Sequence, residues 1–166
     1  MTAAPQSGPP RARRPVAAPG GRRVVLVANP ISGRGRADRM AAEAASVLRA
    51  RGHRAERIPT RLEPTREWLD PAIDGADAMI VVGGDGAVRM VADAAIRTGV
   101  PLHHLPLGTE NLFAREFRST RRPEDLIAAV ERAAVVRVDA AAFEGGSLDG
   151  RLFLLMASIG FDADVV

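Results

Sequence analysis

The sequence predicts an α/β fold built on a parallel sheet. Two short segments, residues 24–28 and 78–82, are apolar throughout, which is typical of strands buried on both faces. A glycine-containing loop follows each segment, and apolar residues then recur at helical spacing. Because this order of strand, loop and helix repeats along the chain, we expect helices on the faces of a parallel sheet.

The expected elements follow one another from residue 24 to residue 133. Strands are expected at residues 24–28, 53–58, 78–82 and 103–105. Helices are expected at residues 36–51, 64–73, 87–97, 112–117 and 123–133. Glycine and proline residues lie between the expected elements, as is typical of the ends of helices.

The composition divides the chain into three parts. Residues 1–22 are rich in Pro, Gly, Ala and Arg, which predicts a disordered basic tail. Residues 23–134 form the α/β domain. Residues 135–166 contain strand-like segments at 135–138 and 151–156, joined by a glycine-rich turn. We expect these to be the first strands of a second, β-rich domain that the chain contains only in part.

The composition also excludes several kinds of site. The 166 residues contain no cysteine, which excludes disulfides, thiolate nucleophiles and cysteine-based zinc sites. They contain no lysine, so a P-loop with its lysine is excluded. No segment approaches the roughly 20 apolar residues that span a bilayer, and a cytoplasmic location is the expectation. The formal net charge is only +3, and the arginine-rich composition indicates little about partners. No nucleic-acid partner is expected.

The sequence Gly83-Gly84-Asp85-Gly86 directly follows the second apolar segment. Glycines tolerate positive φ and leave N–H groups unshielded, so we expect these three to bring the backbone close to an anion. A single carboxylate, that of Asp85, lies among them. A polyphosphate with a cation or a hydroxyl would suit this pattern, and a tight turn without a ligand is the alternative.

Three loops of this kind follow apolar strands, at residues 29–35, 83–86 and 108–111. The carboxyl ends of parallel strands meet at one edge of the sheet, where ligands bind. Together the loops supply glycines, hydroxyls and amides close to helix N-termini, which favour anions. A nucleotide phosphate site is therefore predicted. A Rossmann dinucleotide site is the competing interpretation, but Asp38 stands where its third glycine is required.

Three motifs carry a family resemblance. They are Asn29-Pro30-x-Ser32-Gly33-x-Gly35, Gly83-Gly84-Asp85-Gly86 and Pro106-x-Gly108-Thr109-x-Asn111-x-x-Ala114-Arg115. In order and spacing they resemble the signatures of the diacylglycerol kinase catalytic domain family, which includes bacterial lipid kinases and sphingosine kinases. The resemblance extends from about Arg23 to Val166.

The resemblance implies an ATP-dependent lipid kinase that transfers the γ-phosphoryl group, with Mg²⁺, to a lipid hydroxyl such as that of diacylglycerol or a sphingoid base. It also implies a cleft between the α/β domain and a β-sandwich domain, and peripheral contact with a membrane. The residues implied to line the nucleotide are Asn29, Ser32, Gly33, Thr60, Gly84, Asp85, Gly86, Gly108, Thr109 and Asn111.

Two acids have further roles by resemblance to sphingosine kinases. Asp85 is implied as the catalytic base, and Asp164 as a contact to the lipid head group. Bacterial diacylglycerol kinases instead use a glutamate far into the C-terminal domain, and no residue of this chain matches it. We therefore expect this chain alone to be inactive.

The chain departs from the family pattern at several positions. Ala87 replaces the usual threonine, which removes a hydroxyl. A hydrogen bond to a charged group is worth about 1.5–3 kcal/mol, so nucleotide affinity would fall roughly ten- to a hundredfold if nothing compensates. Arg89 and Met90 replace a common Asn-Glu pair, and Glu110 enlarges a position that is often small. Arg89 could contact phosphate or face solvent.

Two other functions remain open. The departure at Ala87 allows a non-catalytic nucleotide-binding domain, and the Gly-Gly-Asp-Gly turn also resembles that of kinases acting on NAD. Adjacent His103 and His104 lack a third metal ligand at suitable spacing, so we expect structural histidines. Trp68 is expected in the core or in a lid.

Overall fold

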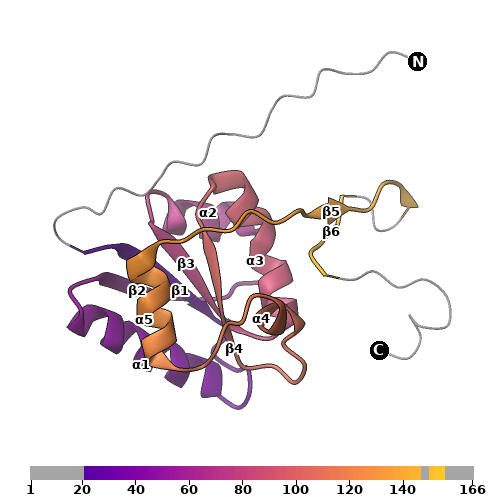
Figure 1. Cartoon of the computed structure of the whole chain (residues 1–166). Helices are drawn as coiled ribbons and strands as arrows, with labels where there is room; N and C mark the ends of the chain where they lie inside the picture. The colour runs from indigo at the N-terminus through magenta and orange to yellow at the C-terminus, as the bar shows by residue number, and fades with distance from the viewer. Residues whose placement is uncertain (1–20, 147–149, 156–166) are drawn as a thin grey trace.

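A computed structural model describes residues 21–146 and 150–155 of the chain. Its centre is a four-stranded sheet in the order β2-β1-β3-β4, and every neighbouring pair is parallel (Figure 1). The strands are β1 (Arg23–Ala28), β2 (Arg54–Pro59), β3 (Ala78–Gly83) and β4 (Leu102–Pro106). The predicted α/β fold with a parallel sheet is therefore confirmed.

Helices cover both faces of this sheet (Figure 1). One face carries α1 (Arg36–Ala50) and α5 (Pro123–Arg132), and the other carries α2 (Thr65–Ile73) and α3 (Asp85–Thr98). The short helix α4 (Leu112–Glu116) follows β4. The helices predicted from apolar spacing are all present.

The burial of β1 and β3 explains why their sequences lack polar alternation. These two strands occupy the middle of the sheet, and residues 24–28 and 79–83 are all buried. Successive side chains point to opposite faces, so Leu26 packs towards α1 and α5 while Val27 packs towards α2 and α3. Trp68 of α2 joins the second core, with its indole N–H donating to the Glu63 carbonyl at 3.1 Å.

An ion-pair network links α2 to α3 on the sheet face that they share. The guanidinium of Arg97 donates two hydrogen bonds to the carboxylate of Asp70, both at 2.8 Å, and a third to the Thr65 hydroxyl at 3.1 Å. It also pairs with Asp93 one turn earlier on α3. The hydrogen bonds to Asp70 raise the pKa of Arg97 above its ordinary value.

The region after α5 differs from the sequence-based expectation. No strand forms at residues 135–138, where Val135, Val136 and Val138 are 52%, 74% and 48% exposed. A short antiparallel pair forms later, between β5 (Ala141–Ala142) and β6 (Leu152–Phe153). The valine-rich segment 135–138, which Arg137 interrupts, has no neighbouring strand among the described residues, so its valines alone were a misleading signal.

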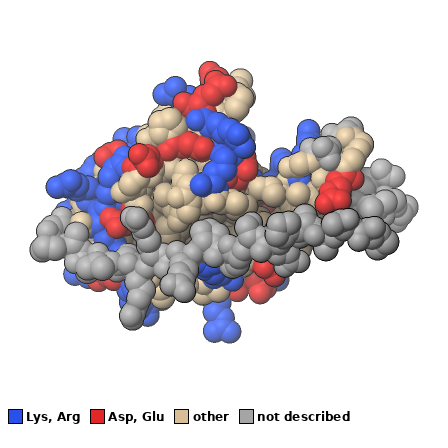
Figure 2. Space-filling view, turned by 90° about the horizontal axis from the view of Figure 1, so that it is seen from above, with Lys and Arg blue, Asp and Glu red and all other residues tan. Residues whose placement is uncertain are grey.

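Several expectations concern parts of the chain outside the described residues. Residues 1–20 of the predicted tail lie there, as do residues 156–166 with Asp164. The second, β-rich domain stays a prediction. Within the described part of the chain, no helix is both long and apolar enough to cross a membrane. Arginine and acidic side chains lie interspersed over the face drawn in Figure 2.

Candidate functional site

The loop between β1 and α1 is folded by local hydrogen bonds. The Ser32 N–H donates to the Asn29 carbonyl at 3.0 Å, and the Asn29 side-chain oxygen accepts from the Ile31 N–H at 3.1 Å. Gly33 and Gly35 have φ of 58° and 80°, which glycine adopts without strain. The loop therefore presents Asn29 and Ser32 at the carboxyl end of β1.

The turn between β3 and α3 uses its glycines differently from the prediction. None of Gly83, Gly84 and Gly86 has a positive φ, so that expectation was wrong. Close packing explains Gly83 and Gly84 instead. A Cβ on Gly83 would lie 2.7 Å from the Ala87 Cβ. A Cβ on Gly84 would lie 3.1 Å from the Gly108 Cα, and a Cβ on Gly108 would lie 2.7 Å from the Gly84 Cα. The two loops therefore meet backbone to backbone, at a distance that leaves no room for a Cβ at Gly108 and little room for one at Gly84.

The loop between β4 and α4 is closed by its own asparagine. The Asn111 side-chain oxygen accepts from the Gly108 N–H at 2.7 Å, and the Asn111 amide donates to the Gly108 carbonyl at 2.6 Å. The asparagine backbone is left-handed, with φ of 51°. Thr109 is exposed at the tip of the loop. Asn111 thus holds the Gly108 backbone in place against Gly84.

Asp85, the predicted catalytic residue, links the second loop to the third. Its two carboxylate oxygens accept hydrogen bonds from the N–H groups of Leu112 and Phe113, each at 2.9 Å. These are among the N–H groups at the start of α4 that have no partner within the helix. The carboxylate therefore ties the start of α3 to the start of α4.

A cavity of about 330 Å³ opens at this edge of the sheet. Among the residues predicted to line a nucleotide, the structure brings together Asn29, Ser32, Thr60, Gly84 and Gly86 around it. The other predicted residues, Gly33, Asp85, Gly108, Thr109 and Asn111, lie in the same three loops but do not line the cavity.

Part of the cavity wall was not among the residues predicted to line the nucleotide, although the sequence had singled out Ala87 as a departure from the family pattern. Ala87 and Met90 line it from one face of α3, and Val82 and Gly83 line it from β3. Residues three apart on a helix are neighbours on its surface, so the position of Met90 relative to Ala87 was the available signal. Arg89 is exposed and outside the cavity.

The two adjacent histidines of β4 face opposite sides of the sheet, and both titrate abnormally. The pKa of His103 is lowered from 6.5 to about 4. Burial is the larger cause, and the charge of a protonated His104 is the smaller one. Burial also lowers the pKa of His104, although the hydrogen bond to the Gly83 carbonyl and the nearby charge of Asp85 oppose this. Both rings are therefore neutral at pH 7.

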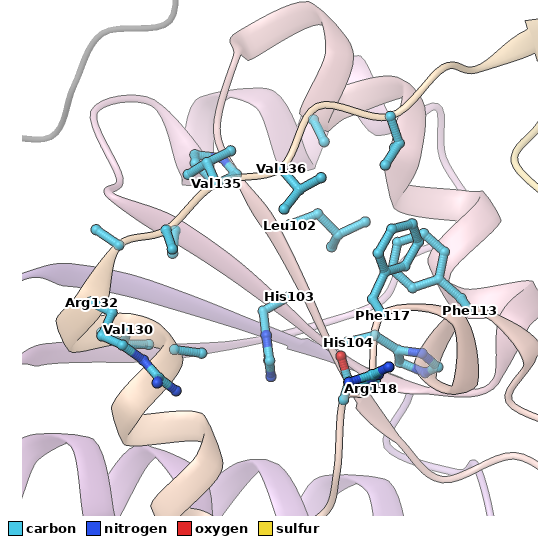
Figure 3. Close-up of a pocket in the computed structure, with 18 of the residues that line it drawn as sticks. Leu102, His103, His104, Phe113, Phe117, Arg118, Val130, Arg132, Val135 and Val136 are labelled. Carbon is cyan, nitrogen blue, oxygen red and sulfur yellow. The ribbon is translucent and has the colours of Figure 1, made fainter.

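A larger cavity, of about 550 Å³, lies along the outer edge of β4 and away from the three loops (Figure 3). Leu102 and His103 lie near its centre, with Val136 of the segment after α5 on one side. Phe117, which directly follows α4, and Arg132, at the end of α5, also border the cavity. Its size does not make it the candidate site, because the hydrogen-bonded loops surround the smaller cavity.

The family to which the chain belongs follows from its match to known sequences. The diacylglycerol kinase catalytic domain family matches residues 23–143, which include all three loops. The chain belongs to this family. As a family member it has a lipid-kinase-like catalytic domain, and its α/β domain has the fold that the resemblance implied for that part.

Relatives and solved structures agree with this membership. A diacylglycerol kinase of Mycobacterium tuberculosis is 31% identical over 144 residues, which cover 85% of this chain and 47% of that protein. A YegS-like lipid kinase of Pseudomonas fluorescens is 38% identical over 93 residues, covering 55% of this chain and 29% of that protein. The fold matches a crystal structure of a diacylglycerol kinase from Bacillus anthracis with a TM-score of 0.61 and 22% identity, over 87% of this chain and 51% of the other. The chain thus spans about half the length of these two diacylglycerol kinases.

Proposed function

We propose that this member of the diacylglycerol kinase family is the nucleotide-binding part of an ATP-dependent lipid kinase. In the proposed reaction the γ-phosphoryl group of ATP is transferred to a lipid hydroxyl. The observation that carries the proposal is the backbone contact of Gly84 with Gly108 beside a cavity of about 330 Å³. Glycines that leave backbone N–H groups unshielded at the carboxyl edge of a parallel sheet suit a polyphosphate.

In this proposal each loop has a separate task. Asn29, Ser32 and Thr60 offer an amide and two hydroxyls to the nucleotide from the β1 and β2 side of the cavity. The backbone at Gly84 and Gly86 contacts phosphate from the β3 side. The start of α3 supports this, because its N–H groups and dipole favour an anion.

Asp85 remains the proposed catalytic base of the chain. A carboxylate has about four lone-pair sites, so the bonds from α4 leave acceptor capacity on each oxygen for a substrate hydroxyl or a cation. Phosphoryl transfer depends mainly on positioning and charge neutralisation, which suits an acid held in one orientation. Mg²⁺ would supply charge neutralisation at the phosphates, and one carboxylate with the phosphates themselves is a common way to hold it.

The lipid side of the proposal rests on family membership. We propose a lipid acceptor reached from the membrane periphery by a protein of the cytoplasm, with Asp164 as the contact to the head group. Diacylglycerol and sphingoid bases are the acceptor classes to test. A nucleotide-binding domain without catalysis and a kinase acting on NAD are the alternatives that the same test separates.

A single glycine tests the nucleotide site without disturbing the fold. A Cβ on Gly86 would meet no heavy atom within 4 Å, and the backbone there has no positive φ. Gly86→Ala should therefore unfold at the temperature of the wild type or slightly above it, because alanine also restricts the unfolded chain. If phosphate approaches this backbone, the added methyl group should weaken ATP binding about tenfold or more. Titration calorimetry on this chain measures the affinity, with Ser46→Ala on the exposed side of α1 as the matched control.

Phosphoryl transfer is tested separately, with the full-length gene product. Labelled ATP is supplied with diacylglycerol, a sphingoid base or NAD, and the labelled product is identified. A labelled lipid supports the proposal, and labelled NAD supports the kinase for a soluble substrate. ATP binding without any labelled product would overturn the lipid kinase and leave a nucleotide-binding domain.

A further inference from the structure

His104 is a fully buried polar side chain that the sequence did not place in the site. It has no exposed surface, and its Nε2 lies 2.8 Å from the Gly83 carbonyl oxygen. A carbonyl oxygen can only accept, so the neutral ring must carry its proton on Nε2 and donate it. The other ring nitrogen, Nδ1, is buried and has no hydrogen-bond partner among the residues that the structure describes.

Packing alone does not account for a histidine at this position. A buried polar atom without a partner destabilises the fold, and an apolar side chain of similar size would avoid that loss. The ring does pack edge-on against Phe113, with 5.9 Å between ring centroids, but a phenyl ring could do the same (Figure 3). What only the histidine supplies here is the Nε2–H donor.

That donor acts on the peptide that joins Gly83 to Gly84. The Gly83 carbonyl accepts from His104 and from the Leu107 N–H at 2.7 Å, and both partners lie on the β4 side. The described part of the chain has no cis peptide bond, and in a planar trans peptide the C=O and N–H point in opposite directions. The Gly84 N–H therefore points away from β4. Because β3 lies between β4 and β1, it points to the side where Asn29 and Ser32 line the cavity.

A second tie holds the same region from α4. Phe113, which contacts the His104 ring, donates its backbone N–H to the Asp85 carboxylate. His104 and Asp85 therefore reach the turn between β3 and α3 through separate bonds. The turn is fixed from two directions, and only one of them was predictable from the motif.

We propose that His104 is a positioning residue, which holds the Gly83–Gly84 peptide so that the Gly84 N–H faces the phosphate of a bound nucleotide. The inference rests on the proposed function, because it assigns a role within the same nucleotide site. His104 itself does not touch the nucleotide in this proposal.

Three variants separate the donor from the ring. His104→Phe keeps a ring against Phe113 but removes the donor, whereas His104→Gln places an amide N–H near the position of Nε2. His103→Phe makes the same exchange one residue earlier, where the side chain makes no such bond, and serves as the matched control. At pH 7.5 we expect His104→Phe to weaken ATP binding by up to about tenfold, the value of one hydrogen bond. His104→Gln should bind within about threefold of the wild type, and His103→Phe should bind as the wild type does.

The measured pattern decides between positioning and mere stability. If His104→Phe unfolds at a lower temperature yet binds ATP like the wild type, the inference is overturned. If the wild type itself binds no ATP, the proposed function fails first, which is a different result. Should His104→Phe not fold, ¹⁵N NMR of the wild type decides: an Nε2–H ring and a Gly84 amide signal that moves on adding ATP support the inference. An Nδ1–H ring or an unmoved Gly84 signal overturns it.

Discussion

The abnormal titration of His103 should make the stability of this protein depend on pH. In the folded chain the pKa of His103 lies at about 4, against 6.5 for an ordinary histidine. Between these two values the unfolded chain binds a proton that the folded chain does not. Acidification through this range therefore favours unfolding, and the free energy of unfolding rises with pH.

The size of the effect follows from the shift. A change of the pKa from 6.5 to about 4 corresponds to about 3 kcal/mol in the free energy of unfolding, between a pH above both values and a pH below both. His103 is only partly enclosed and water screens part of its charge, so we expect about 2 kcal/mol to be lost between pH 7 and pH 4.5. Urea unfolding at the two pH values, followed by circular dichroism, measures it.

His103→Leu isolates this contribution, because it removes the titrating ring and leaves His104 in place. The free energy of unfolding of His103→Leu minus that of the wild type should be about 2 kcal/mol more positive at pH 4.5 than at pH 7. Carboxylates titrate in both proteins, so their contribution cancels. The smaller charge interaction between His103 and His104 is lost with the His103 ring and is part of the measured difference. If both lose the same stability on acidification, the folded pKa of His103 is ordinary and the burial argument is refuted.

Three further substitutions test the packing and the site. Gly108→Ala places a Cβ 2.7 Å from the Gly84 Cα, so thermal unfolding should show a loss of about 1–3 kcal/mol. Arg97→Ala removes the paired hydrogen bonds to Asp70 between α3 and α2, and the same measurement should show a loss of about 2 kcal/mol. Ala87→Thr adds a hydroxyl to the cavity wall, and calorimetry should show ATP binding about tenfold tighter.

Each of these expectations has a result that contradicts it. Wild-type stability of Gly108→Ala would mean that the two loops do not meet as closely as described. An unchanged unfolding temperature for Arg97→Ala would show that the ion pairs of Arg97 contribute nothing to the stability of the fold. Unchanged ATP affinity of Ala87→Thr, together with binding by the wild type, would show that the missing hydroxyl does not face the nucleotide.

The strands and helices of the α/β domain were predictable because local pattern and tertiary position agree. The segments 24–28 and 78–82 are apolar throughout, and only the middle strands of a covered sheet bury both faces. The segment 135–138 also contains three valines, but Arg137 interrupts them, and no strand lies beside the segment in the described part of the chain. A strand depends on its neighbours, and the sequence of one segment does not contain them.

The candidate site was predictable as a set of loops but not as a set of contacts. The motifs placed Asn29, Gly84 and Gly108 at one edge of the sheet, which the structure confirms. They did not show that Gly84 and Gly108 serve the close approach of their two loops and have no positive φ. Nor could they show His104, because a buried hydrogen bond between neighbouring strands has no motif of its own.

The contact between Gly84 and Gly108 has a consequence for how this protein tolerates change. The two positions, 24 residues apart in the sequence, occupy one shared space, and a Cβ at either fits only if the facing backbone shifts. A larger residue at one position cannot be offset by a smaller one at the other, since both are already as small as a residue can be. In a library randomised at both codons and selected for folding, glycine should return at both together, whereas a codon randomised at position 86 should accept alanine.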